Sequence, residues 1–245
     1  MVNMTGKYNP EHFLKEKARI GKLSQIRELV FGAQDGLLVP LGVVTSVAGA
    51  FNNNHIVIVA GISEALAGAF SMATGAYLAS QAERQVHSAE IAQEKKAIKD
   101  FPKEEQAEMV QLFEKEGVTR QDSQKLSDIL SKHLNSFTIT MIQKELGLDP
   151  EPPGTPTGDA VMVGLSYLIA AIVPLFPYFF FTGITAISVS MGATLVALFV
   201  IGVAKGKVAT LPYLKSGLQV LLIGAASGIG GYFLGTILPK LLHLE

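Results

Sequence analysis

The sequence predicts an all-α integral membrane protein with five transmembrane helices and a cytosolic three-helix module. Hydrophobic residues make up 49% of the chain and charged residues only 17%, whereas soluble domains average about 25% charged residues. Charge is nearly absent from residues 29–82 and 160–204 but dense from 83 to 151. This uneven distribution predicts membrane spans on both sides of a water-exposed module.

Each apolar segment holds roughly 20 residues, which is enough at 1.5 Å per residue to cross a hydrocarbon core about 30 Å thick. The predicted spans are residues 29–50, 56–79, 160–181, 184–204 and 214–238. The chain then divides into a cytosolic N-terminal segment (1–28), the first two spans (29–80), the module (81–151), and a linker with the last three spans (152–245).

The distribution of lysine and arginine residues predicts how the chain is oriented across the membrane. Six of them precede the first span, and Lys205, Lys207 and Lys215 lie between the fourth and fifth spans. The loop at residues 51–55 contains neither residue type. Because lysine and arginine are enriched in cytosolic loops, we expect the N-terminus and the module in the cytosol and the C-terminus outside.

Local signals divide the module into three predicted helices. The first continues the second span from Gln81 to about Lys99, with no helix breaker between them. Pro102 starts a second helix that ends at Gly117, and a third covers residues 122–146 before Gly147. Prolines between residues 150 and 156 make a stiff linker to the third span.

Glycine pairs recur at four-residue spacing inside the spans. The pairs are Gly32/Gly36, Gly224/Gly228 and Gly231/Gly235. Small residues at this spacing let helix backbones approach closely in a membrane. We therefore expect these glycines at helix contacts within or between subunits.

Two carboxylates fall where lipid is expected, and neither has a basic partner in a span. Asp35 lies about six residues into the first span, and Glu64 lies near the middle of the second. A charged side chain at such depth costs several kcal/mol, so it normally faces a pore or a partner. Met72 is expected at the same level as Asp35, about 10 Å from the cytosolic surface. Oxygen and thioether ligands together suit a borderline-soft ion such as Fe²⁺.

The neighbours of these residues also favour an ion path. One face of the second span carries a small, polar stripe made of Glu64, Gly68, Ser71, Met72 and Gly75. Pro40 cannot donate a hydrogen bond to the carbonyl of Gly36, which leaves an acceptor beside Asp35. Each residue also has a purely structural interpretation. Asp35 and Glu64 could bond to a neighbouring helix, Met72 could only pack against apolar side chains, and Pro40 could only kink its helix.

The module carries further candidate ligands on each predicted helix. They form three pairs that each share one helix face: Glu90 with Glu94, Glu105 with Glu108, and Met141 with Glu145. Any one pair is ordinarily solvated surface. If the three faces converge, their oxygens and the methionine sulfur would fit Fe²⁺, or Mn²⁺ and Zn²⁺ less selectively.

Several function classes lack support in the residues. The net charge of −1 gives no reason to expect a nucleic-acid partner, and without cysteine there is no thiolate metal site. The chain has no P-loop motif for ATP and no Glu-x-x-His motif of ferritin-like di-iron bundles. Because we also find no nucleophile–base pair, we expect neither an enzyme nor a prosthetic group.

Five motifs together resemble the vacuolar iron transporters. They are FGAQDGLLVP at residues 31–40, GISE at 61–64, SMATGAYL at 71–78, KELGL at 144–148 and VPLFPY at 173–178. The likeness extends from about residue 24 to about residue 240.

This resemblance implies a five-span homodimer that exchanges cytosolic Fe²⁺ for protons. Asp35 and Met72 match translocation residues of the family, and Glu64 matches an acidic position on the same path. The ligands of the family's cytosolic metal-binding domain correspond to Glu94, Glu105, Glu108, Met141 and Glu145.

One position departs from the family pattern. Ala97 stands where the family has a second glutamate, three residues after Glu94, and Glu90 is a candidate substitute ligand. Plant members of the family are vacuolar. Without a long N-terminal extension before the first span, we expect the plasma membrane of a prokaryote here, or the vacuolar membrane if the source is a eukaryote.

The sequence thus supports a role in iron homeostasis, as a homodimeric antiporter that exports Fe²⁺ from the cytosol in exchange for protons. The ion is cargo, with Mn²⁺, Zn²⁺ or Co²⁺ as alternatives, because the ligand set accepts several divalent ions. A transporter of Mn²⁺ or of many divalent metals is one rival interpretation. A membrane-tethered metal buffer or sensor without transport is another.

Overall fold

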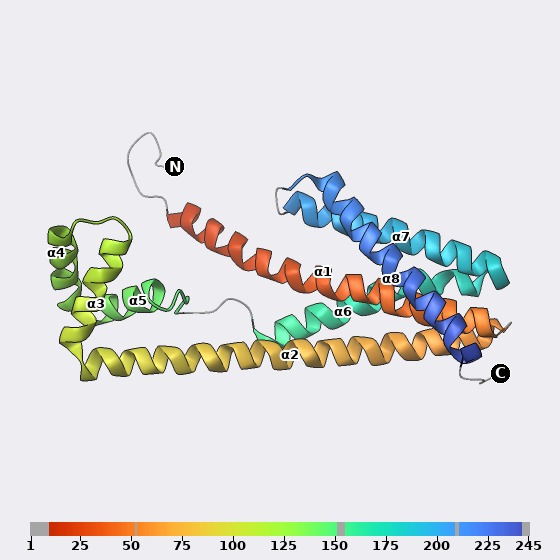
Figure 1. Cartoon of the computed structure of the whole chain (residues 1–245), viewed down its shortest axis with the longest axis horizontal. Helices are drawn as coiled ribbons and strands as arrows, with labels where there is room; N and C mark the ends of the chain where they lie inside the picture. The colour runs from red at the N-terminus through yellow and green to blue at the C-terminus, as the bar shows by residue number, and fades with distance from the viewer. Residues whose placement is uncertain (1–9, 52, 151–154, 209–210, 242–245) are drawn as a thin grey trace. The chain divides into compact units, whose positions relative to one another are not determined.

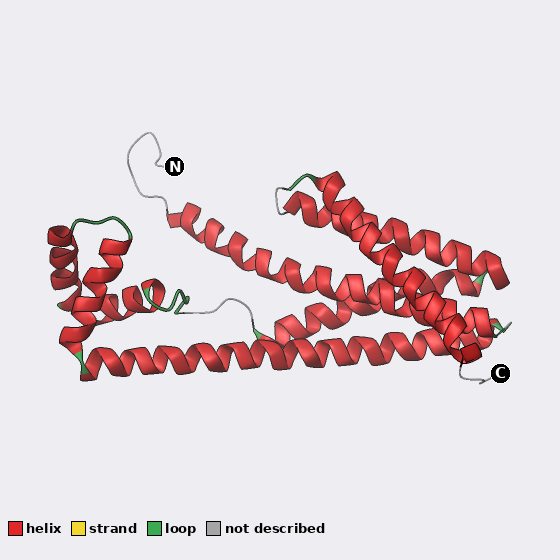
Figure 2. Ribbon diagram, viewed as in Figure 1, coloured by secondary structure: helices red, strands yellow, loops and turns green. Residues whose placement is uncertain are grey.

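The computed structural model describes residues 10–51, 53–150, 155–208 and 211–241, and side chains within 26–51, 53–150, 155–207, 211–226 and 229–230. All regular elements in these ranges are helices (Figures 1 and 2), as the sequence predicts. They are α1 (Pro10–Ala50), α2 (Asn54–Asp100), α3 (Pro102–Lys115), α4 (Arg120–Ser131), α5 (Leu134–Lys144), α6 (Pro156–Leu175), the 3₁₀ turn η1 (Phe176–Phe179), α7 (Gly183–Val208) and α8 (Tyr213–Leu241).

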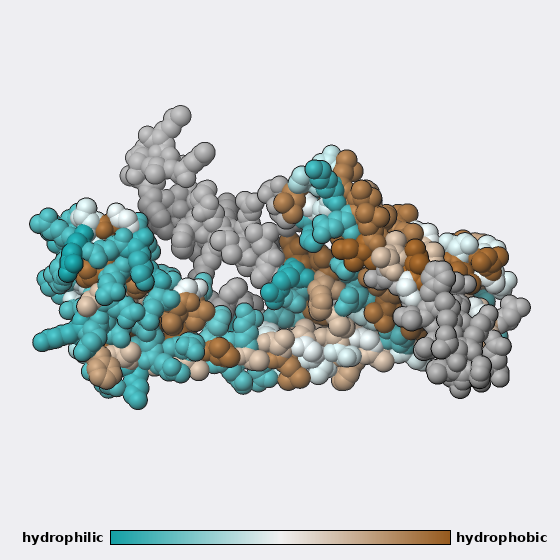
Figure 3. Space-filling model, in the orientation of Figure 1, coloured by the Kyte–Doolittle hydropathy of each residue, from teal (hydrophilic) through white to brown (hydrophobic). Residues whose placement is uncertain are grey.

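The helices form two compact units. One comprises Met1–Leu78 with Gly154–Glu245, and the other is Ala79–Pro153. Hydrophobic side chains gather on the first unit, whereas helices α3 to α5 present a mainly hydrophilic surface (Figure 3). Helix α2 contributes to both units and runs unbroken for 47 residues, which confirms the prediction that the second span continues past Gln81.

Four helices in the described ranges are long and apolar enough to cross a membrane. These stretches are Ile26–Ala50, a window within α2, Pro156–Phe179 and Gly183–Lys207, and they match the first four predicted spans. The fifth predicted span falls on α8, whose described side chains include an apolar stretch, Tyr213–Ala226. The prediction of an integral membrane protein with long apolar helices is therefore confirmed.

The third span ends differently from the prediction. Residues 160–181 were expected to form one helix. Instead, α6 ends at Leu175, and the next four residues form the 3₁₀ turn η1. Two prolines, Pro174 and Pro177, remove backbone donors from this region. Ser190 of α7 donates to the Pro174 carbonyl at 2.6 Å, and the side chain of Asn54 donates to the carbonyls of Tyr178 and Phe181. These bonds fix the turn to α7 and to the start of α2.

Glycines bring α1 against α6, as predicted for Gly32 and Gly36. A Cβ atom added at Gly36 would overlap the backbone of Tyr167, including its carbonyl oxygen, and one added at Gly32 would overlap the carbonyl of Val163. Backbone meets backbone here, which agrees with small-residue packing in membranes. Gly224 contacts Leu198 of α7; the side-chain surroundings of Gly228, Gly231 and Gly235 lie outside the described residues.

The second unit has its own apolar core. Ile98 from α2, Met109 and Phe113 from α3, and Phe137 and Met141 from α5 pack together. Pro102 begins α3, and the hydroxyl of Thr119 caps α4 by accepting a hydrogen bond from the amide of Asp122. Both predicted stop residues, Gly117 and Gly147, adopt positive φ angles of 94° and 64°.

The prediction of a single third helix over residues 122–146 is wrong. The chain breaks at Lys132 and His133 into α4 and α5, although neither residue is a strong helix breaker. Helix α4 packs on α3 through Ser127, whose hydroxyl donates to the Gln106 carbonyl. After the break, α5 buries Phe137, Thr138, Met141 and Ile142, and Phe137 and Met141 pack with Ile98 of α2 in the core.

The glycine contact between α1 and α6 yields a stability prediction. Gly36→Ala should lower the thermal unfolding midpoint in detergent, because its Cβ has no room against the Tyr167 backbone. Gly42→Ala in the same helix is the matched control, since nothing lies within 4 Å of its added Cβ. It should be neutral or stabilising by up to about 1 kcal/mol, the helix preference of alanine over glycine. Equal midpoints for the two variants would contradict the proposed close contact.

Candidate metal sites

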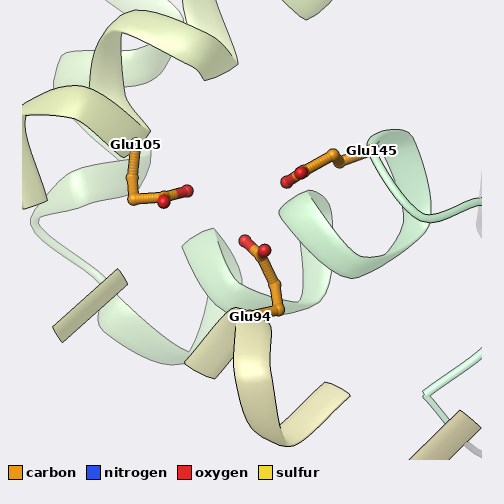
Figure 4. A group of neighbouring side chains, drawn as sticks. All are labelled: Glu94, Glu105 and Glu145. Carbon is orange, nitrogen blue, oxygen red and sulfur yellow. The ribbon is translucent and has the colours of Figure 1, made fainter. Parts of the chain in front are cut away.

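Three carboxylates from separate helices of the second unit meet at one point. One oxygen each of Glu94 (α2), Glu105 (α3) and Glu145 (the C-terminal cap of α5) lie within 4.8 Å of one another (Figure 4). Oxygen ligands bind first-row divalent ions at about 2.1 Å, so two ligands of one ion lie up to about 4.2 Å apart. Small side-chain rotations would therefore bring these oxygens onto one ion.

Helix periodicity explains why these carboxylates converge. Glu94 precedes Ile98 by one turn, Glu105 precedes Met109 by one turn, and Glu145 follows Met141 by one turn. Residues four apart share a helix face, and Ile98, Met109 and Met141 belong to the same apolar core. The core that holds the three helices together thus also fixes the three carboxylates beside it.

Two of the three carboxylates, Glu94 and Glu105, are buried, and Glu145 is exposed. The exposed fraction is 6% for Glu94 and 8% for Glu105. Among the described residues, no hydrogen-bond partner is found for Glu94 Oε1 or Glu105 Oε2. Leaving a buried polar atom unpaired is costly, so the site favours a bound cation or proton.

The pKa values of this group reflect the same burial and mutual repulsion. Burial, followed by the charges of Glu145 and Glu105, raises the pKa of Glu94 to about 7. Burial, then the charge of Glu145, raises the pKa of Glu105. Desolvation, then the charge of Glu108, raises the pKa of Glu145. Because a carboxylate binds metal in its deprotonated form, metal binding at Glu94 should release protons below about pH 7.

The other predicted ligands of the module are placed less uniformly. Glu108 is exposed, but its charge acts on all three carboxylates. Met141 is fully buried in the apolar core. Glu90 is exposed and lines an open cavity of about 550 Å³ together with Glu94, Glu145 and Ala97.

In the first unit, the predicted path residues lie on α1 and α2. Asp35, Glu64 and Met72 are each half-buried. Glu64 accepts a hydrogen bond of 2.5 Å at Oε1 from the hydroxyl of Tyr167 on α6. The predicted pairing of Asp35 with Met72 stays a prediction.

Tyr167 is not among the residues predicted from the sequence. A tyrosine in the interior of an apolar helix is a usable signal, because tyrosine in membrane proteins concentrates at the interfaces. Its partner could not be chosen without the structure, since Glu64 lies 103 positions away along the chain.

The fold and the acidic group together define a helical membrane protein with a candidate divalent-metal site. Comparison with known proteins agrees with this class. The model of the VIT family matches residues 26–236, and the chain therefore belongs to the VIT family. This is a family of transporters, so the chain is not an enzyme, as the sequence analysis expected.

Named relatives cover most of the chain. This chain is 32% identical over 208 residues to Vacuolar iron transporter 1 of Eucalyptus grandis, and the match covers 84% of each protein. It is 34% identical over 209 residues to Vacuolar iron transporter 1 of Oryza sativa subsp. japonica, covering 84% of this chain and 82% of the relative. For Vacuolar iron transporter 1 of Arabidopsis thaliana the identity is 29% over 228 residues, with 93% and 90% covered.

The raised pKa of Glu94 predicts how the stability of the metal-free protein depends on pH. The folded state keeps a proton up to about pH 7, whereas an unfolded glutamate releases it near its usual pKa of about 4.3. The free energy of unfolding should therefore fall as pH rises between these two values and stay low above them. Thermal unfolding of chelator-treated protein at pH 5.5 and pH 8 measures this change.

Glu94→Gln should weaken that pH dependence and raise the unfolding midpoint at pH 8. Glu83→Gln, an exposed position on the same helix, is the matched control and should leave the dependence as in the wild type. A wild-type midpoint that is equal at both pH values would contradict the burial of an uncompensated carboxylate.

Proposed function

We propose that this protein is a homodimeric Fe²⁺/H⁺ antiporter that exports Fe²⁺ from the cytosol. The convergence of Glu94, Glu105 and Glu145 supports this proposal, because three close carboxylates, two of them buried with an oxygen that has no described partner, favour a bound cation or protons. Membership in the VIT family supports the choice of transport, and the names of the relatives support the choice of iron.

The proposed transport path runs through the first unit. Asp35 and Met72 bind the ion, and Glu64 carries protons or completes the ion path. A carboxylate and a thioether suit Fe²⁺ better than Ca²⁺ or Mg²⁺. Because Fe²⁺ and H⁺ compete for the same carboxylate oxygens, binding of one cargo requires release of the other, and this competition couples the two fluxes.

The proposed role of the second unit is to gather metal on the cytosolic side. Glu94, Glu105 and Glu145 form the central ligand group, with Glu108 and Met141 as further ligands. Ala97 supplies no ligand, and Glu90 lines the same open cavity, so Glu90 is the proposed substitute. This unit concentrates ions near the membrane and releases them to the path.

The orientation proposed for the chain follows its lysines and arginines. The N-terminus and the second unit lie in the cytosol, and the C-terminus lies outside. The membrane is the plasma membrane in a prokaryote and the vacuolar membrane in a eukaryote.

Uptake of Fe²⁺ into proteoliposomes with an imposed pH gradient tests this function. Wild-type protein should accumulate Fe²⁺ at a rate that follows the gradient. Asp35→Ala should reduce the rate at least about tenfold, because it removes a charged ligand from the path. Gly42→Ala, in the same helix and without a close neighbour, should keep the wild-type rate.

The same assay separates transport from metal buffering. A buffer or sensor would give no flux in any variant, and its metal binding would depend on Glu105 and Glu108 but not on Asp35. Repeating the assay with Mn²⁺ separates an iron transporter from one that carries many divalent metals. Flux that persists in Asp35→Ala would remove Asp35 from the path.

A further inference from the structure

The hydrogen bond between Tyr167 and Glu64 leaves one carboxylate oxygen engaged and the other available. The phenol hydroxyl donates to Glu64 Oε1 at 2.5 Å. Glu64 Oε2 is buried and has no hydrogen-bond partner among the described residues. Glu64 therefore presents a single unengaged oxygen from a half-buried position on α2.

The phenol is confined at this position from two sides. The Tyr167 side chain is 2% exposed, and its backbone lies against Gly36, next to Asp35. A Cβ atom at Gly68, one turn after Glu64, would overlap the phenol hydroxyl and lie 2.6 Å from the Tyr167 ring carbon Cζ. The absence of a side chain at Gly68 thus provides the space in which the phenol meets the carboxylate.

We propose that Tyr167 is a specificity-determining residue that restricts Glu64 to ligation through one oxygen. This inference rests on the proposed function, because it assigns Glu64 to the ion path. Ca²⁺ takes six to eight oxygen ligands and readily accepts both oxygens of one carboxylate. A carboxylate oxygen that accepts a hydrogen bond from a phenol has less electron density and less space to offer a metal ion, so Tyr167 disfavours two-oxygen binding of large, hard cations relative to Fe²⁺.

Competition by Ca²⁺ in the Fe²⁺ uptake assay tests this role. The measured quantity is the Ca²⁺ concentration that halves Fe²⁺ uptake into proteoliposomes under reducing conditions. Tyr167→Phe keeps the packed ring and frees Glu64 Oε1. It should lower the half-inhibiting Ca²⁺ concentration by about tenfold or more, because a hydrogen bond to a charged group contributes at least about that factor.

Tyr178→Phe is the matched control. Tyr178 is also a fully buried tyrosine of the membrane unit, 1% exposed, but it packs with Val44, Val57 and Leu175. Its substitution removes one buried hydroxyl without touching Glu64, so the half-inhibiting Ca²⁺ concentration should equal that of the wild type. A purely structural role of buried tyrosines would change both variants alike.

Gly68→Ala provides a second variant in case Tyr167→Phe fails to fold. Its Cβ would overlap both the phenol hydroxyl and Glu64 Oε1, so the hydrogen bond between them should be lost while Tyr167 remains. This variant should also increase inhibition by Ca²⁺. Unchanged inhibition in a folded Tyr167→Phe or Gly68→Ala protein would overturn the inference while leaving the transporter intact. Absence of Fe²⁺ uptake in the wild type would overturn the proposed function and this inference with it.

Discussion

In the second unit, an apolar core holds three mutually repelling carboxylates close together. Glu94, Glu105 and Glu145 would move apart if their helices were free. Each negative charge makes it less favourable to ionise the other two, and two of the side chains are buried away from water. They stay together because Ile98, Met109 and Met141, each one turn away, are packed against one another. Hydrophobic packing thus fixes the spacing of a site that electrostatics alone would open.

In the first unit, close contact between helix backbones positions the predicted path residues. Gly32 and Gly36 let α1 lie directly on α6, and the same residue of α6, Tyr167, reaches α2 at Glu64. One tyrosine therefore touches the two helices that carry the predicted path residues Asp35 and Glu64. A larger residue at Gly36 or Gly68 would disturb this junction, which gives these glycines a role in placing charge as well as in packing.

The sequence was sufficient for features that depend on local chemistry. Long apolar segments predict the membrane helices, the absence of a breaker predicts the unbroken α2, and Gly117 and Gly147 mark helix ends with positive φ angles. The sequence predicted that Glu94, Glu105 and Glu145 would form a site only if three helix faces converged. A sequence shows which residues share a face, but it does not show which faces meet.

Features that depend on tertiary packing were missed. The break at Lys132 and His133 has no strong local signal in the sequence. The pairing of Tyr167 with Glu64 joins residues far apart in the chain. The burial of Met141 in the apolar core could not be derived from its spacing from Glu145, and its role as a ligand stays a prediction.

In the metal-free protein, the buried carboxylates Glu94 and Glu105 of the second unit are expected to hold protons until a divalent ion replaces them. Calorimetric titration of the metal-free full chain with Mn²⁺ at pH 6.5, in buffers of different ionisation enthalpy, measures proton release on binding directly. We predict release of about one proton per ion bound and an affinity that rises with pH. Binding with no proton release and no dependence on pH between 6 and 8 would contradict it.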